Sequence, residues 1–117
     1  MGNDEVCDQS TIEVRTLRII SKKSLVDFWN LPGRQDSEDA LKAWHEIAKS
    51  AVWRSPSDVK AQYRNCSLVG DNRVVFNIKG NSYRLIVKIN YRAREPIAFI
   101  RFVGTHLEYD HINAEEV

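Results

Sequence analysis

Hydrophobic residues in the first half of the chain recur at the spacing of helix faces. A short apolar run at residues 17–20 predicts a first strand, and Ser21 follows it as a candidate helix cap. Three large apolar side chains then take positions i, i+3 and i+4 of one helix face: Leu25, Phe28 and Trp29. Residues 31–33 contain a proline and a glycine, which interrupt helices, so this helix is predicted to end there.

A second, longer helix is predicted to begin at Asp36 or Ser37. Its apolar residues are spaced three, four and three apart and form an amphipathic stripe: Leu41, Trp44, Ala48 and Ala51. Ser55 is a cap residue followed by Pro56, and proline is favoured at the first position of a helix. Residues 57–63 are therefore predicted to form a short third helix.

The second half of the chain alternates apolar and polar residues, which is the period of β-strands. Residues 73–79 place valine, phenylalanine and isoleucine on one face. Gly80 and Asn81 then supply turn residues, and residues 82–91 continue the alternation. These segments predict an antiparallel hairpin.

Arg84 and Lys88 lie on the face of the second hairpin strand opposite its main apolar residues, so this face carries positive charge. A third strand over residues 97–103 is predicted to return antiparallel beside it. The register of that strand decides the position of Arg101, which would lie opposite Val87 or opposite Lys88. The sequence leaves both registers open.

Helices that precede a run of antiparallel strands predict an α+β fold, with an N-terminal strand and helices packed on an antiparallel β-sheet. The helices should cover the apolar face of the sheet and leave the cationic face uncovered. The 117 residues, 43% of them hydrophobic, suffice for one domain, which we expect to span residues 17–117.

Residues 1–16 are polar and acidic and show no apolar period, so we expect a disordered extension that contributes nothing to the fold. One alternative is an acidic tail that lies across the basic face of the sheet.

Removal of residues 1–16 should leave folding and activity intact. The truncation should cost at most ~1 kcal/mol of the free energy of unfolding, the scale of a modest surface change. Urea denaturation of the full and shortened chains measures this difference. A shortened chain that does not fold would make the extension part of the domain.

The formal net charge of +1 conceals an asymmetry along the chain. Residues 14–114 contain all 17 Lys and Arg but only 10 of the 16 Asp and Glu, which is a net charge of about +7. Such a basic body favours a polyanion or an acidic partner.

The sequence excludes several classes of protein. It contains no run of about 20 apolar residues and no apolar stretch at the N-terminus, so we expect a cytoplasmic protein without membrane contact. Cys7 and Cys66 are too few and too far apart for a disulfide framework or a thiolate metal site. Both cysteines are expected to be free thiols.

Titratable side chains gather behind Gly104, where the third strand is predicted to end. If Thr105 opens a helical turn, His106, Tyr109 and Asp110 share one face of that turn. Histidine readily takes up and releases a proton near neutral pH, so the turn is a candidate proton-transfer site. The structural alternative is a short cap in which Tyr109 packs and Asp110 holds a nearby donor.

The same region offers only a weak pattern for a metal site. His106 and His111 are five residues apart, with Asp110 between them. Zinc takes three or four convergent ligands, and the whole chain has 3 histidines. We therefore expect no metal and no other cofactor.

A cationic sheet face with a proton-transfer group at its rim is suited to cutting RNA. The substrate carries its own nucleophile, the 2′-OH, so the protein has to remove its proton, stabilise the phosphate and protonate the leaving oxygen. Two other classes stay open: a non-catalytic RNA-binding module, and an interaction protein whose basic groove receives an acidic partner.

Five motifs in order along the chain resemble the HigB toxins, which are RelE-like messenger-RNA interferases of type II toxin–antitoxin systems. The motifs are residues 17–23, 58–60, 75–85, 88–91 and 100–110. The resemblance covers roughly residues 17–117 and implies a bacterial toxin that cuts mRNA, generally on the translating ribosome. Members of this family commonly begin with methionine where this chain has Leu17, which implies, as an alternative to a disordered extension, a start assigned too early, with initiation at the codon of Leu17.

The resemblance also implies a partner. HigB toxins are silenced by a HigA-type antitoxin with a helix-turn-helix domain. Promoter DNA would be bound only through that antitoxin.

Two sets of candidate site residues follow from the cationic face, the titratable cluster and the family motifs. The catalytic candidates are His106, Tyr109, Asp110 and Arg84. The RNA-binding candidates are Lys79, Lys88, Arg101 and Lys60.

Overall fold

The first half of the protein is helical after one short strand. The computed structural model describes residues 16–117. In chain order this half contains strand β2 (Arg18–Ile20), helix α2 (Lys22–Trp29), a 3₁₀ turn (Gln35–Ser37), helix α3 (Glu38–Lys49) and helix α4 (Pro56–Gln62). The predicted strand and helices are confirmed, with ends that differ by one or two residues.

The second half is β-sheet up to a last helical turn. In chain order it contains strands β3 (Ser67–Val69), β4 (Arg73–Ile78), β5 (Tyr83–Asn90) and β6 (Ile97–Thr105), followed by helix α5 (His106–Tyr109). The strands lie in the order β2-β6-β5-β4-β3 in one sheet. Strands β4 and β5 form the predicted hairpin, with Ile78 paired to Tyr83 across the turn.

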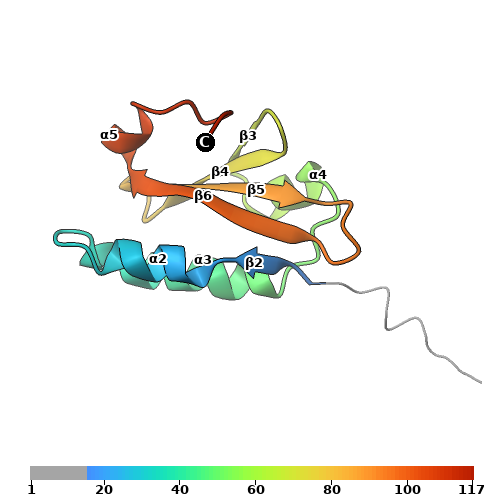
Figure 1. The fold of residues 1–117 in the computed structure, drawn as a ribbon, viewed down its shortest axis with the longest axis horizontal. Coiled ribbons are helices and arrows are strands. Elements are labelled where there is room, and N and C mark those ends of the chain that lie inside the picture. The colour runs from blue at the N-terminus through green and yellow to red at the C-terminus, as the bar shows by residue number, and fades with distance from the viewer. Residues whose placement is uncertain (1–15) are drawn as a thin grey trace, which may run out of the picture.

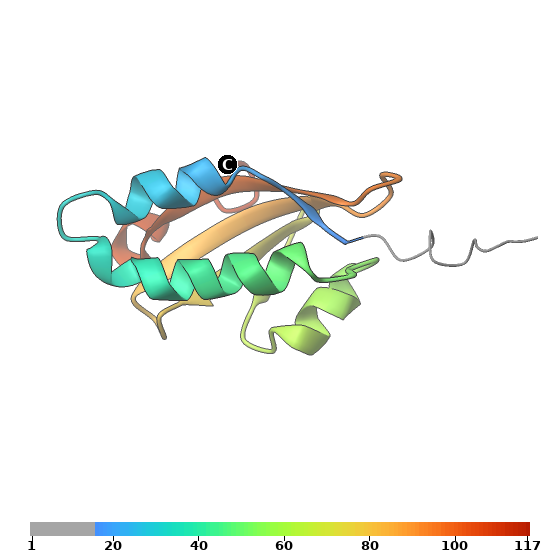
Figure 2. The same ribbon diagram turned by 90° about the horizontal axis from the view of Figure 1, so that it is seen from below.

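Helices α2 and α3 lie along one face of this sheet (Figure 1), and Figure 2 shows them side by side across it. The side chains that the sheet turns toward them are the apolar members of the alternation. They are buried and include Val74, Phe76, Ile78, Leu85, Val87 and Ile89. The α+β prediction and the predicted apolar face of the hairpin are therefore confirmed.

The two helices contribute their predicted stripes to the same core. Leu25, Phe28 and Trp29 are buried on α2, as are Leu41, Trp44 and Ala48 on α3. The ring of Trp44 lies 5.3 Å from the ring of Phe76 in an edge-to-face arrangement, which is favourable for aromatic pairs. Ser21 occupies the cap position of α2, but its side chain makes no capping hydrogen bond.

The sheet differs from the predicted one at both edges. Strand β2 runs parallel to β6, so the sheet is mixed and not wholly antiparallel. No hairpin turn joins these two strands, so nothing local fixes their relative direction. At the other edge, β3 pairs antiparallel with β4. This strand was not predicted, because Ser67–Val69 is too short to show an alternation.

Arg101 lies opposite neither Val87 nor Lys88, so both predicted registers are wrong. Val87 pairs with Ile100, and the register between β5 and β6 shifts between Ile86 and Val87. Arg101 is therefore the extra residue of a β-bulge, a feature that often redirects a side chain.

We call the sheet face away from α2 and α3 the outer face. It was expected to be uncovered, but α5 and the residues after it lie over part of it (Figure 1). Val75 and Ile86 pair across β4 and β5 on this face and are buried, although they do not belong to the main core. The expectation of a bare cationic face is thus wrong in part, because the chain folds back over the sheet after β6.

Two predictions concern residues outside the described part of the chain. The extension predicted for residues 1–16 lies outside the described residues except for Thr16, and Cys7 also lies outside them. Cys66 is described as a buried free thiol, and burial raises its pKa. None of the helices in residues 16–117 has the length and apolar character needed to cross a membrane.

Candidate functional site

Helix α5 begins directly where β6 ends, and reciprocal hydrogen bonds fix this junction. The Thr105 hydroxyl accepts from the backbone N–H of Glu108 at 3.1 Å, and the Glu108 carboxylate accepts from the backbone N–H of Thr105 at 2.8 Å. This capping box confirms the helical turn predicted at Thr105. His106, Tyr109 and Asp110 consequently lie on one turn, where the Asp110 N–H donates to the His106 carbonyl at 3.1 Å.

The capping box yields a stability prediction. Thr105→Ala should lower the free energy of unfolding by about 1 kcal/mol, because the first turn loses its side-chain acceptor. Thr105→Ser keeps the hydroxyl and should stay close to the parent protein. Urea denaturation compares the three proteins, and equal stabilities of the two variants would mean that the box does not stabilise the fold.

The Glu108 carboxylate also links α5 to the loop after α2. Its second oxygen lies 3.6 Å from a guanidinium nitrogen of Arg34. The pKa of Glu108 is held below its ordinary value, chiefly by the hydrogen bond from the Thr105 backbone and further by the charge of Arg34. A Cβ at Gly104 would lie 2.6 Å from the Phe102 ring and 2.9 Å from Glu108, so close packing at this corner favours glycine.

Arg84 and Tyr109 join strand β5 to this helical turn. The guanidinium carbon of Arg84 lies 5.8 Å from the centre of the Tyr109 ring, within the range of a cation–π contact. A guanidinium nitrogen of Arg84 also donates to the Asn81 carbonyl at 3.0 Å. The His106 backbone N–H donates to the Ser82 carbonyl at 3.2 Å, so His106 lies beside the same β4–β5 turn.

We define the rim cluster as Arg84, His106, Tyr109 and Asp110. His106 and Asp110 are exposed, whereas Arg84 and Tyr109 are half-buried. The structure thus brings the four predicted catalytic residues to one corner of the outer face. A polymer too large to enter a closed cavity could reach them there.

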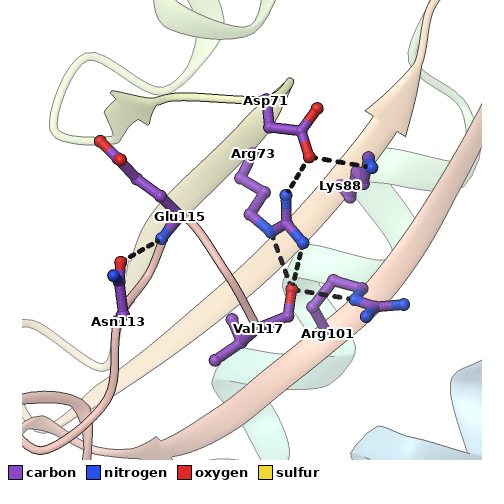
Figure 3. A network of polar contacts seen from close by, with 7 residues as sticks. All are labelled: Asp71, Arg73, Lys88, Arg101, Asn113, Glu115 and Val117. Carbon is purple, nitrogen blue, oxygen red and sulfur yellow. Dashed lines mark hydrogen bonds and ion pairs between the residues drawn. The ribbon is translucent and has the colours of Figure 1, made fainter.

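A second group of charges, which we define as the cationic strip, consists of Arg73, Lys88 and Arg101. These residues come from β4, β5 and β6, and Asp71 lies among them (Figure 3). The Asp71 carboxylate accepts from Arg73 at 2.7 Å and from Lys88 at 3.1 Å. These hydrogen bonds, the one from Arg73 first, hold the pKa of Asp71 below its ordinary value.

Lys88 and Arg101 border a groove of about 490 Å³, which Asp71, Asn90 and Phe99 also line. The structure therefore brings these two predicted RNA-binding residues together. Arg84 precedes Lys88 by four residues on β5, which is about 13 Å along a strand. It belongs to the rim cluster, and the two clusters follow one another along the outer face.

Arg73 is the charged residue of this face that the sequence reasoning missed. Its side chain is 6% exposed, and the sequence pattern predicted it only as the first residue of a strand. The predicted hairpin could have identified it, because a turn at Gly80 and Asn81 pairs Arg73 with Lys88. The structure shows this pairing.

Lys79 and Lys60 are held outside both clusters. The Lys79 ammonium pairs with the Asp36 carboxylate at 2.7 Å, just before α3. The Lys60 ammonium donates to the carbonyl of Cys66. The structure does not bring these two predicted RNA-binding residues to the others.

The Asp36 carboxylate yields a prediction about acid sensitivity. The hydrogen bond from Lys79, followed by one from the Tyr83 hydroxyl, lowers the pKa of Asp36 from its ordinary value of 3.8. A carboxylate of this kind stabilises the fold above its unfolded-state pKa, and the contribution is lost as the pH falls through the folded-state pKa. The urea concentration at the midpoint of unfolding should therefore decrease as the pH is lowered below about 4. The decrease should be smaller in the Asp36→Asn protein. The same pH dependence in both proteins would contradict this assignment.

The histidines at the rim are not accompanied by enough ligand side chains to form a metal cluster. Within residues 16–117, no three His, Cys, Asp or Glu side chains gather in a way that could hold a metal ion. His111 follows α5 and is exposed, and its backbone N–H donates to Glu108. The chemistry offered by the rim cluster is proton transfer, hydrogen bonding and positive charge.

Comparison with known proteins assigns the family. Residues 37–112 match the model of the HigB toxin family, described as the RelE-like toxic component of a toxin–antitoxin system. The match extends past the end of α5 and includes both clusters of the outer face. A search of curated proteins finds no significant match. The family expected from the sequence motifs is thereby confirmed, and the helices with a five-stranded mixed sheet agree with a RelE-like fold. The chain belongs to the HigB family of RelE-like toxins.

Proposed function

We propose that this toxin is a metal-independent endoribonuclease that cuts messenger RNA by attack of the substrate 2′-OH. The observation that carries the proposal is the rim cluster, in which the Arg84 guanidinium lies 5.8 Å from the Tyr109 ring, on the turn that begins with His106. In this proposal Arg84 supplies the positive charge, and His106, on the turn that Arg84 contacts through Tyr109, transfers the proton. Phosphodiester cleavage needs both.

Each group of the rim cluster has a role in the proposed reaction. His106 removes the 2′-OH proton, with Tyr109 and Asp110 orienting it or acting in its place. The 2′ oxygen forms a bond to phosphorus as the bond from phosphorus to the 5′ oxygen breaks, and the leaving 5′ oxygen takes up a proton from water. The products are a 2′,3′-cyclic phosphate and a 5′-OH. Arg84 stabilises the charge that develops on the phosphate oxygens.

The cationic strip would hold the RNA backbone beside the reacting phosphate. Lys88 and Arg101 border an open groove and supply positively charged hydrogen-bond donors. The net charge of about +7 over residues 14–114 adds a long-range attraction to nucleic acid. We propose mRNA on the translating ribosome as the substrate, as the family resemblance implies.

Membership of a toxin–antitoxin family implies an antitoxin partner. We propose a HigA-type antitoxin with a helix-turn-helix domain, through which the complex would bind its own promoter. Such an antitoxin would silence the toxin by covering the basic outer face or by preventing entry into the ribosome. Opposite charges would speed the association of the two proteins.

Controlled expression tests this proposal. The gene is induced in a bacterium either alone or together with the neighbouring reading frame, and growth and full-length transcripts are followed. Induction alone should stop growth with loss of intact mRNA, and the neighbouring frame should restore both. A chain that is harmless when induced alone at high level would contradict the toxin activity, and growth arrest with intact transcripts would contradict the cleavage.

A further inference from the structure

The end of the described chain lies on the cationic strip. We call residues 113–117 the C-terminal segment. The backbone oxygen of Val117 accepts hydrogen bonds from Arg73 Nε at 2.8 Å, from Arg73 Nη2 at 2.5 Å and from Arg101 Nε at 3.1 Å (Figure 3). One main-chain oxygen thus accepts hydrogen bonds from two guanidinium groups, one on β4 and one on β6.

The acceptors on the strip come from two places, Asp71 and Val117. In the network of Figure 3, Asp71 is the one carboxylate that contacts the strip, and it is shared between Arg73 and Lys88. The other acceptor of Arg73, and the acceptor of Arg101, is the Val117 backbone oxygen. A phosphate oxygen makes the same kind of hydrogen bond to a guanidinium, so the Val117 oxygen takes a position that an RNA phosphate would need.

The hydrogen bonds within the C-terminal segment are all accepted by Asn113. It forms a turn in which the Asn113 carbonyl accepts from the N–H groups of Glu116 at 3.0 Å and Val117 at 3.2 Å. The Asn113 side chain accepts from the N–H of Glu115 at 3.0 Å. The segment contains no helix or strand, and it lies beyond the region that matches the family. It can therefore leave the strip without unfolding an element of the sheet.

We propose that the C-terminal segment competes with RNA phosphate for Arg73 and Arg101, so that RNA must displace the toxin's own chain to occupy the whole outer face. This inference rests on the proposed function, because it assumes that RNA binds this face. It makes Arg73 a phosphate-binding residue. It also means that the C-terminal segment lowers the affinity of the protein for RNA, an effect that we call the brake.

The size of the brake follows from the fraction of molecules whose strip is free. The apparent dissociation constant equals the intrinsic one divided by that fraction. If the segment occupies the strip about nine-tenths of the time, its release should tighten RNA binding about tenfold, which corresponds to about 1.4 kcal/mol.

A variant of the full chain tests the brake without changing its charge. Asn113→Gly combined with Ala114→Gly loosens the turn and keeps Glu115 and Glu116 in place. Its matched control, Glu115→Gln combined with Glu116→Gln, removes both charges and keeps the turn. The probe is a fluorescently labelled 2′-O-methyl octauridylate, which carries phosphates but lacks the attacking hydroxyl. Binding is measured by fluorescence anisotropy at low and at high salt.

The glycine variant should bind the probe about tenfold more tightly than the parent protein. The glutamine variant should gain affinity only at low salt, because a screened charge effect disappears at high salt. Unchanged binding by the glycine variant would overturn the inference. So would equal gains for both variants at every salt concentration.

A double-mutant cycle with Arg101→Ala tests whether the competition occurs at the strip. In the parent protein this change removes a phosphate contact and also loosens the segment, so the loss of affinity should be at most about threefold. In the glycine variant nothing offsets the lost contact, and the loss should be about tenfold. Equal losses in both backgrounds would overturn the inference.

These measurements separate the inference from the proposed function. The methylated probe cannot be cut, so its binding does not depend on catalysis. The expected affinity pattern together with absent mRNA cleavage would support the brake and overturn the nuclease. Cleavage together with unchanged affinity in the glycine variant would support the nuclease and overturn the brake.

Discussion

Replacement of Arg84 by alanine is expected to lower mRNA cleavage by about 100-fold or more. One preorganised donor contributes a few kcal/mol to the stability of a charged transition state, and Arg84 is the cation of the rim cluster. Cleavage is measured as the initial rate of transcript loss in a translating extract with the purified toxin.

The matched control for this prediction is Arg94→Ala. Arg94 also carries one positive charge, but it is exposed in the loop between β5 and β6, outside both clusters. This control should retain nearly full activity, which separates a local role from an effect of net charge. A folded Arg84→Ala protein as active as the Arg94→Ala protein would remove Arg84 from the site.

Replacement of His106 by glutamine is expected to lower cleavage by roughly 10²–10⁴-fold, the usual contribution of a general acid or base. Glutamine keeps the approximate size and hydrogen-bonding capacity of histidine but cannot transfer a proton in this way. The fold should survive, because His106 is exposed and its contact with Ser82 is made by the backbone. The same extract assay measures the loss, and circular dichroism checks the fold.

His111→Gln is the matched control for this second prediction. His111 is also exposed and lies just after α5, so its replacement changes the same kind of side chain in nearly the same place. This variant should keep its activity. Persistent cleavage in His106→Gln with an unchanged pH profile would instead assign proton transfer to Tyr109 or His111.

Most of the fold could be predicted because its elements are specified locally. Leu25, Phe28 and Trp29 mark the buried face of α2 by spacing alone, and alternation marks the buried face of the β4–β5 hairpin. The parallel pairing of β2 with β6 could not be predicted in this way. It depends on which edge of the sheet the first strand joins and in which direction, and no turn connects the two strands.

The rim cluster could be predicted for the same reason. His106, Tyr109 and Asp110 lie within one turn, and Thr105 with Glu108 carries the capping signal for that turn in the sequence. The cationic strip was found only in part. The position of Arg101 depends on a β-bulge, and no residue pattern in β6 predicts that bulge.

The interaction of the C-terminal segment with Arg73 was beyond the reach of the sequence patterns used. It joins residues 44 positions apart through a backbone oxygen, which carries no residue-specific signal. The burial of Val75 and Ile86 on the outer face likewise depends on how the chain folds back over the sheet.

The chemistry of the cut ends tests the central claim most directly. After brief induction of the toxin, the 3′ ends of mRNA fragments are captured by a ligation that accepts only 2′,3′-cyclic phosphates, and the ends are sequenced. Attack by the 2′-OH predicts abundant cyclic-phosphate ends within coding regions in the parent protein and few in Arg84→Ala. Fragments ending in 3′-OH, or intact transcripts in arrested cells, would contradict the proposed reaction.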